Sequence, residues 1–394
     1  MKRLLFVYPY MGIGGSTMSL LAVLDNVDYQ EYSVDLLLFS TKGPLTDLVP
    51  PQVRIHASSG YLDRKRLIRQ CRRAMSPKYV AAWTKGELQA RLRGRKAAKA
   101  QMLGLAIADF LPQPTGVIYD SAIAFLEFGP VAFVAALPNT RSRIAWIHTD
   151  YEASGALPSV EDKVLSAFDR IVLVSPSCVD SFERLYPSSA GRTQCIENIV
   201  SRELLERRNI HEDDPSLMID ADIFRSAEVQ FVTVARIDFA SKGQDRALRA
   251  FHEISKSTSP HRTFHWWVIG DGPDSDAFCR MIAELHMLPY VSWLGALRNP
   301  FSLMSRMDLF LLPSRYEGKP IAITEAQMLG LPVLASRYGA VDSQVNNGID
   351  GLVVENTEEG LYAGLLEILT DSTMLANLKL GAATSRRGGS TSSS

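Results

Sequence analysis

Two glutamates eight residues apart are the first candidates for chemistry in this chain. Glu317 and Glu325 lie on either side of Gly318 and Pro320. Because the first turn of a helix tolerates proline, this spacing predicts a tight loop that enters a helix. One carboxylate at the loop and one about two turns along the helix can reach different hydroxyl groups of a single polyhydroxylated ligand. In the alternative interpretation, Glu317 only offsets the helix dipole and Glu325 faces solvent.

Two cations precede these glutamates in the second half of the chain. Arg236 follows an apolar run at residues 230–235, and Lys242 with Gly243 stands at the start of a helical pattern. Because the carboxyl ends of parallel strands meet at one edge of a sheet, both cations can point at one site. Together with helix N–H groups they could neutralise a diphosphate.

Glycines follow strands at further points. Gly14 and Gly15 stand between the first apolar run and a helical pattern, where a backbone can approach an anion closely. The third glycine of the dinucleotide fingerprint is missing, which disfavours a nicotinamide enzyme. Gly270, in a sharp turn that also contains Gly272, ends a later strand, and Gly295 ends the next one; both strand ends could leave room for a flat ligand. Glycine-rich strand-to-helix turns also occur in such sheets without a ligand.

Metal and redox sites are not predicted. Asp274 and Asp276 have the D-x-D spacing of metal-dependent sugar transferases, but an aspartate here is expected to cap a helix instead. The four cysteines are scattered without C-x-x-C pairs, which indicates neither zinc nor a disulfide framework, and the compartment is expected to be reducing. They are Cys71, Cys178, Cys195 and Cys279.

The elements that must hold these residues follow from alternating patterns. Short apolar runs alternate with longer segments of helical period, which predicts α/β units with parallel sheets wrapped by helices. Strands are expected in the first half at residues 4–8, 34–39, 121–126, 143–148, 171–175 and 194–197. In the second half they are expected at residues 230–235, 265–269, 291–294, 309–312, 333–335 and 352–354.

The length of 394 residues suits two domains. We expect one over residues 1–205, a charged linker over 206–228, a second domain over 229–380 and a tail over 381–394. The tail is rich in Gly and Ser and is expected to be disordered.

A net charge of -1 argues against nucleic acid as a partner, and no apolar run is long enough for a signal peptide or a membrane span. Between Arg64 and Lys99, however, thirteen Lys or Arg residues accompany a single Glu. This basic segment indicates either a solvated helix face or contact with anionic lipid headgroups or a phosphorylated acceptor.

Taken in order, the motifs resemble family 4 of the retaining glycosyltransferases, the glycosyl transferases group 1. The resemblance extends from Gly14 and Gly15 through Arg236, Lys242-Gly243, Gly270-Asp271-Gly272-Pro273 and Trp293-Leu294-Gly295 to the two glutamates and residues 347–353. It implies a GT-B fold, in which two Rossmann-like domains face each other across a cleft.

The resemblance also implies roles for individual residues. Arg236 and Lys242 would bind the donor diphosphate, Glu325 the ribose, and Glu317 a hydroxyl of the transferred sugar. His148 would face the cleft, and Gly14 and Gly15 would approach the donor. Backbone groups of Gly270, Gly272, Gly318 and Lys319 would also bind the donor. Ser175 and Asn198 are weaker candidates. A lone histidine is otherwise more often structural.

The implied activity is metal-independent transfer of a hexose, with retention, from a nucleotide-sugar to a glycan or lipid-linked glycan in cell-surface polysaccharide or glycoconjugate synthesis. No cofactor is implied beyond the substrate, which is expected to be UDP-linked. The protein would be cytoplasmic or peripheral at the inner membrane face. Members of the family usually end in a helix that crosses back to the first domain, whereas the helical pattern here stops near Leu380. This difference leaves a non-catalytic nucleotide-binding partner subunit as the alternative, and a nucleotide-sugar epimerase as a more distant one.

Overall fold

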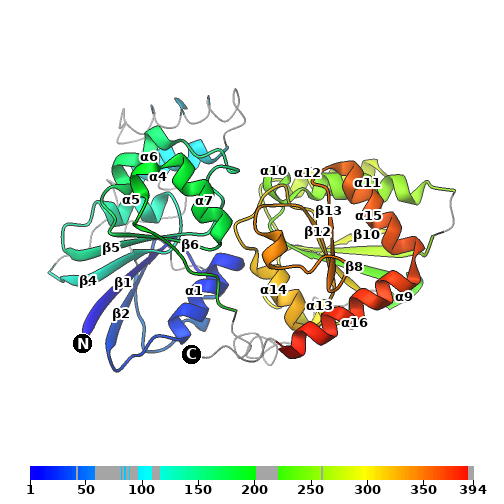
Figure 1. Ribbon diagram of the computed structural model, residues 1–394, viewed down its shortest axis with the longest axis horizontal. Coiled ribbons are helices and arrows are strands. Elements are labelled where there is room, and N and C mark those ends of the chain that lie inside the picture. The colour runs from blue at the N-terminus through cyan, green and yellow to red at the C-terminus, as the bar shows by residue number, and fades with distance from the viewer. Residues whose placement is uncertain are drawn as a thin grey trace. The chain divides into compact units, whose positions relative to one another are not determined.

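A computed structural model describes residues 1–40, 43–57, 96–108, 116–200, 221–258 and 261–388, together with Ala81, Thr84, Lys85 and Leu88. The chain divides into two compact units, Met1–Ile199 and Val200–Ser394. Each unit is built on one parallel sheet with helices packed on both faces (Figure 1). The predicted α/β class with two such units is confirmed.

The first unit has a seven-stranded sheet in the order β3-β2-β1-β4-β5-β6-β7. Its strands are β1 Lys2–Tyr8, β2 Tyr32–Leu38, β3 Arg54–Ala57, β4 Tyr119–Ala124, β5 Thr140–Ile147, β6 Arg170–Leu173 and β7 Thr193–Cys195. The strand order reverses between β1 and β4, and ligands of open α/β sheets bind at such a switch point, beyond the carboxyl ends of the strands.

Helices cover both faces of this first sheet. On one side lies α1 Gly15–Asp25, and the other side carries α4 Lys96–Ala108, α5 Gly129–Ala135, α6 Pro158–Leu165 and α7 Pro176–Leu185 (Figure 1). Phe133 of α5 and Phe182 of α7 are fully buried in the same apolar core as Leu5 and Val7 of β1. Short 3-10 turns lie at Thr46–Leu48 and Pro187–Ser189.

The second unit repeats this plan with a six-stranded sheet in the order β10-β9-β8-β11-β12-β13. The strands are β8 Val229–Val234, β9 Phe264–Ile269, β10 Val291–Trp293, β11 Leu309–Leu312, β12 Val333–Ser336 and β13 Gly351–Val354. Strand β9 is buried along its whole length. Because successive side chains alternate, Trp266 enters the core on one face and Trp267 the core on the other. The switch point lies between β8 and β11.

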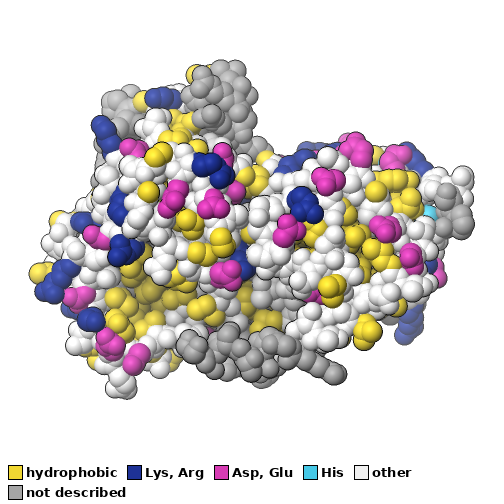
Figure 2. Space-filling view, in the orientation of Figure 1, with side chains coloured by type: hydrophobic (Ala, Val, Ile, Leu, Met, Phe, Trp, Pro, Cys, Tyr) yellow, Lys and Arg dark blue, Asp and Glu magenta, His cyan; other side chains and the backbone are white. Residues whose placement is uncertain are grey.

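The two cores of the second unit are closed by helices. One core contains side chains of α11 Gln244–Ser255, α12 Ser275–Glu284 and α15 Glu358–Thr370, and the other those of α13 Phe301–Met304 and α14 Ile321–Met328. The remaining elements are α9 Ala221–Ser226, α10 Phe239–Lys242, α16 Ser372–Gly388 and a 3-10 turn at Val341–Ser343. On the face shown in Figure 2, basic and acidic side chains are interspersed over this unit.

The predicted tail is wrong at its start, because α16 continues through Gly388. The helix is held against the unit beyond Leu380: Ala382 is buried, and the Ser385 hydroxyl donates to Asp350 at 3.2 Å. The predicted linker 206–228 includes helix α9, and its residues 206–220 lie outside the described residues, as do most of residues 64–99. Within the described part of the chain, none of the helices combines the length and the apolar character that a membrane span requires.

Candidate functional site

An ion pair between Lys242 and Glu317 is the centre of the candidate site. The Lys242 Nζ lies 2.6 and 2.7 Å from the two carboxylate oxygens of Glu317. The Ser314 hydroxyl donates to Glu317 Oε1 at 2.6 Å. The Glu317 side chain is 9% exposed and the Lys242 side chain 23% exposed, so the carboxylate is almost enclosed while the ammonium still reaches solvent. In such a pair, a ligand's phosphate can replace the carboxylate as partner of the ammonium, and a ligand's hydroxyl can donate to the carboxylate.

The fold brings these two residues together across the switch point. Lys242 ends the short helix α10 after β8, and Glu317 follows β11, the neighbouring strand. Gly243 then has a left-handed φ of 66°, and a Cβ atom there would lie 2.2 Å from the Pro313 carbonyl oxygen. Glycine therefore lets the turn before α11 touch the chain after β11. The sequence had placed Lys242 at a helix start, whereas it ends one helix just before the next.

Arg236 does not join this pair in the structure. Its guanidinium Nη2 donates to Asp238 Oδ2 at 2.9 Å, and its side chain is 62% exposed. Its backbone carbonyl accepts from the Gln244 side chain at 2.8 Å, which fixes the main chain beside α11. Arg236 follows the end of β8, as the sequence predicted, but its guanidinium lies at the surface and pairs with Asp238.

Glu325 is buried in α14 with 6% exposure, so the solvent-facing interpretation is wrong. Pro320 occupies the N-cap of α14 with an extended ψ of 120°, one position before the expected first turn. Gly318 is buried and Lys319 half-buried in the loop between Glu317 and this cap. The loop and helix predicted from the glutamate spacing are present.

Gly270 and Gly272 serve the packing of the chain after β8 and β9. A Cβ atom on Gly270 would lie 1.9 Å from the Ala235 carbonyl oxygen, and one on Gly272 would lie 2.1 Å from that of Ile237. Protein backbone thus fills the space beside Gly270, where room for a flat ligand was expected. At Gly295, the other strand end expected to leave such room, a Cβ atom would meet nothing within 4 Å, and the same holds at Gly14. It precedes Gly15, the first residue of α1, where open space meets a helix N-terminus.

His148 follows β5 at the carboxyl edge of the first sheet. Its backbone N–H donates to Glu127 Oε2 at 3.3 Å, and its ring packs on Phe125 with centroids 4.8 Å apart. Burial lowers the pKa of His148 to about 4, and Asn198 opposes that shift. Neither ring nitrogen of His148 makes a hydrogen bond to a described residue within the usual limits of distance and angle. The ring is therefore neutral at physiological pH, and both of its nitrogens are buried.

Three weaker candidates have structural roles. The Ser175 hydroxyl caps α7 by accepting from the Cys178 N–H at 3.2 Å. The Asn198 side-chain oxygen accepts from the Ser19 hydroxyl at 3.0 Å and so ties the chain after β7 to α1. Asp274 stands at the N-cap of α12 but makes no capping bond. Its carboxylate instead accepts from the Phe239 N–H at 2.8 Å.

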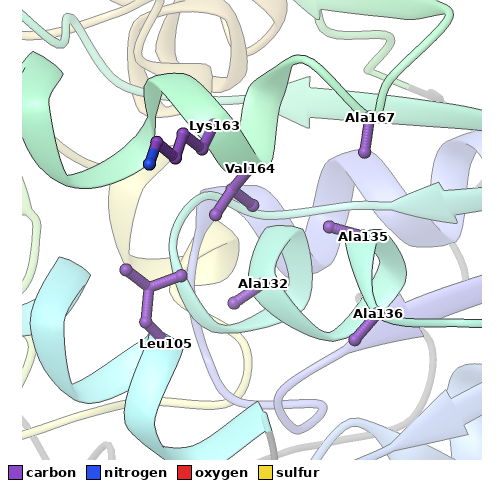
Figure 3. Close-up of a pocket in the computed structure, with 7 residues that line it drawn as sticks. All are labelled: Leu105, Ala132, Ala135, Ala136, Lys163, Val164 and Ala167. Carbon is purple, nitrogen blue, oxygen red and sulfur yellow. The ribbon is translucent and has the colours of Figure 1, made fainter.

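A pocket of the first unit lies among helices α4, α5 and α6 (Figure 3). Its lining is mainly apolar and contains one cation. The lining residues are Leu105, Ala132, Ala135, Ala136, Lys163, Val164 and Ala167. Lys163 is the one polar side chain among them, and no carboxylate, imidazole, hydroxyl or thiol group is included.

The sequence analysis missed Ser314 and Glu127. Ser314 lies three residues before Glu317 and is fully buried, and Glu127 contacts His148 from the end of a different strand. The only sequence signal for Ser314 is the adjacent Pro313, which marks the end of β11.

Known proteins share this architecture. A family model described as glycosyl transferases group 1 matches residues 228–371. Residues 228–371, which lie within the second unit, are similar to this family. The resemblance inferred from the motifs is thus confirmed for this part of the chain. The matched region contains both residues of the Lys242–Glu317 pair.

Curated proteins that are similar to this chain include a synthase and a glycosyltransferase. The chain is 22% identical over 234 residues to the N-acetyl-alpha-D-glucosaminyl L-malate synthase of Bacillus anthracis, a match that covers 58% of each protein. It is 32% identical over 169 residues to the O-antigen biosynthesis glycosyltransferase WclY of Escherichia coli, which covers 43% of each. The chain spans 58%, 39% and 17% of the lengths of the first three curated relatives that it matches.

The solved structure of HepE from Anabaena in complex with UDP and glucose has the same fold. Its TM-score is 0.67 at 15% sequence identity, with 98% of this chain and 95% of that chain covered. Such identity supports fold alone. The GT-B class predicted from the motifs, with two Rossmann-like units in one chain, is confirmed.

Proposed function

We propose that the chain is a retaining glycosyltransferase that moves a hexose from a nucleotide-sugar, UDP-linked, to a glycan or lipid-linked glycan acceptor in polysaccharide or glycoconjugate synthesis. The observation that carries the proposal is the Lys242–Glu317 ion pair at the switch point of a group 1 domain. The UDP and glucose bound by HepE support the choice of donor.

In this proposal Lys242 and Glu317 move apart when the donor binds, and each contacts a different part of the donor. Lys242 turns its ammonium to the diphosphate, and the Glu317 carboxylate accepts a hydrogen bond from a hydroxyl of the hexose. Glu325 accepts from the ribose. Ser314 keeps Glu317 oriented while Lys242 is engaged, because its hydroxyl approaches the carboxylate from within the protein.

The reaction breaks the bond between the anomeric carbon and the diphosphate oxygen and forms a bond from the acceptor oxygen on the same face. The acceptor proton passes to the departing phosphate oxygen. Charge grows on the diphosphate in the transition state, and a fixed cation there contributes several kcal/mol at a site from which water is excluded. We propose that Lys242 has this role without a metal ion, and that Arg236 assists if it leaves Asp238.

The test is turnover with a panel of nucleotide-sugars and glycan acceptors. The parent should release the nucleotide from one donor, and Lys242→Ala and Glu317→Ala should each lower kcat/KM by at least about 100-fold, the usual cost of losing one electrostatic contact to the transition state. Arg249→Ala, on the outer side of α11, should match the parent. Variants as active as the parent would show that the site assignment is wrong.

The alternative of a non-catalytic partner subunit predicts a different result in the same panel. It requires nucleotide binding without turnover for every donor and acceptor. The early end of the helical pattern motivated this alternative, and α16 extends that pattern to Gly388. An epimerase would convert the donor without any acceptor.

We propose further that the protein binds anionic membranes at the cytoplasmic face through residues 64–99. Thirteen cations in this segment motivate the proposal. Liposomes with anionic lipid should bind the protein, and the binding should weaken as salt is added. Equal binding to neutral liposomes would contradict an electrostatic contact.

A further inference from the structure

Arg246 is a buried cation in the first turn of α11, and its contacts converge on the loop that carries Glu317. Its residue exposure is 2%. Nε and Nη2 donate to the Pro313 carbonyl at 3.1 and 2.8 Å, and Nη2 also donates to the Ser314 carbonyl at 3.0 Å and the Ser336 hydroxyl at 2.9 Å. Nη1 donates to the Asn356 carbonyl at 3.0 Å.

These acceptors lie at the carboxyl ends of three neighbouring strands. Pro313 and Ser314 follow β11, Ser336 ends β12, and Asn356 follows β13. The Asn356 amide adds bonds of 2.8 Å to two further carbonyls in the loops after β11 and β12. One side chain from α11 therefore fixes the edge of the sheet where the candidate site lies.

The link from this edge to the site runs through a single residue. The Ser314 carbonyl accepts from Arg246, while its hydroxyl donates to Glu317 Oε1 at 2.6 Å. Glu317 in turn meets Lys242 at 2.6 Å. The peptide held by Arg246 thus carries the hydroxyl that orients the carboxylate.

Burial of this cation is costly. Burial, and secondarily the nearby Arg315, lowers the pKa of Arg246 to about 10, so the guanidinium remains charged at neutral pH. An apolar side chain of similar volume would avoid the desolvation cost. It would also leave the carbonyls of Pro313, Ser314 and Asn356 without the donors that fix their orientation.

We infer that Arg246 is a positioning residue for the proposed donor site, holding the Pro313–Ser314 peptide so that Glu317 meets the hexose. The inference rests on the proposed function. It assigns Arg246 a role in recognising the sugar part of the donor, not the nucleotide part. A lysine at this position keeps the charge but cannot reproduce the planar fork of donors.

The test is a double-mutant cycle on the full-length chain. Calorimetry gives the Kd for UDP and for the UDP-hexose that the parent binds most tightly, and the ratio of the two measures recognition of the sugar. Arg246→Lys should leave the Kd for UDP within about 2-fold and reduce the sugar preference about 10-fold, the equivalent of one charge-assisted hydrogen bond. In a Glu317→Gln background, the same substitution should change the ratio by less than about 2-fold, because the two residues act as a unit.

Arg249→Lys is the matched control, since Arg249 lies on the same helix but is 40% exposed and pairs with Asp245 and Glu358. Its sugar preference should equal that of the parent. If Arg246→Lys does not fold, Ser314→Ala takes its place in the test. It should reduce the sugar preference while leaving the Kd for UDP nearly unchanged.

Three results would overturn the inference. In the first, Arg246→Lys and Ser314→Ala keep the parent's sugar preference while Glu317→Gln loses it. In the second, Arg246→Lys reduces the sugar preference by the same factor in the parent and in the Glu317→Gln background, as a general packing defect would. In the third, the parent binds no UDP-sugar, which overturns the proposed function as well and so differs from the other two.

Discussion

Replacing Lys242 with methionine should expose how strongly the structure depends on its ion pair with Glu317. Unit charges about 4 Å apart attract by roughly 4 kcal/mol at an effective dielectric constant of about 20. Removing one partner of a fully buried pair costs about 3 to 5 kcal/mol. Because the Lys242 side chain is 23% exposed and Ser314 still donates to the carboxylate, we expect Lys242→Met to lower the free energy of unfolding by about 2 kcal/mol.

The assay is urea denaturation of the parent, Lys242→Met, Glu317→Gln and the double variant. The coupling energy of the cycle should be about 1 to 2 kcal/mol, as for residues in direct contact. A matched cycle on Lys379 and Asp308, whose side chains are 44% and 23% exposed, should give less than about 1 kcal/mol. A Lys242–Glu317 coupling no larger than that of the exposed pair would refute the enclosed geometry on which the site rests.

Three further predictions concern backbone and titration. Gly243→Ala should cost more than about 2 kcal/mol by thermal denaturation, because it combines a left-handed φ with a clash against Pro313, whereas Gly348→Ala has a φ of 79° in open space and should cost about 1 kcal/mol; equal losses would contradict the clash. Burial raises the pKa of Glu161 to about 7, so its protonated form stabilises the fold fully below about pH 4.5, and as the pH rises towards about 7 up to roughly 3 kcal/mol is lost. Urea midpoints at pH 5 and 8 should therefore differ less in Glu161→Gln than in the parent. The same difference between the two midpoints in both proteins would contradict this role. Since burial lowers the pKa of His148 to about 4, its ring signals in NMR should not titrate between about pH 5.5 and 8, and a midpoint near 6.5 would show a solvated ring.

The strands were predictable because strands of a parallel sheet covered on both faces are continuous apolar runs. Strands β8 and β9 show this most clearly, with nearly every residue buried. Strand β3 was missed because Arg54–Ala57 contains a single large apolar residue and lies at the edge of the sheet. The end of α16 was missed because its last turns contain Gly, Ser and Arg, although Ala382 is buried.

Residue types of the candidate site were also predictable, since Lys242 and Glu317 follow strands that adjoin the switch point. Their direct contact was not, because it depends on how closely Gly243 approaches Pro313, which is remote in sequence. For the same reason Gly270 was expected to make room for a ligand, although it packs on Ala235. Arg246 lies in a charged stretch typical of an exposed helix face, and only the fold shows that it is buried.

The most direct test of the account is a crystal structure of the chain with the UDP-sugar that it turns over or binds best. We predict a phosphate oxygen within ion-pair distance of Lys242 Nζ and a hydroxyl of the hexose hydrogen-bonded to Glu317, with the 2.6 Å contact between the two side chains lengthened. A donor bound elsewhere, with Lys242 and Glu317 still joined to each other, would contradict the assignment of this ion pair as the sugar-nucleotide site.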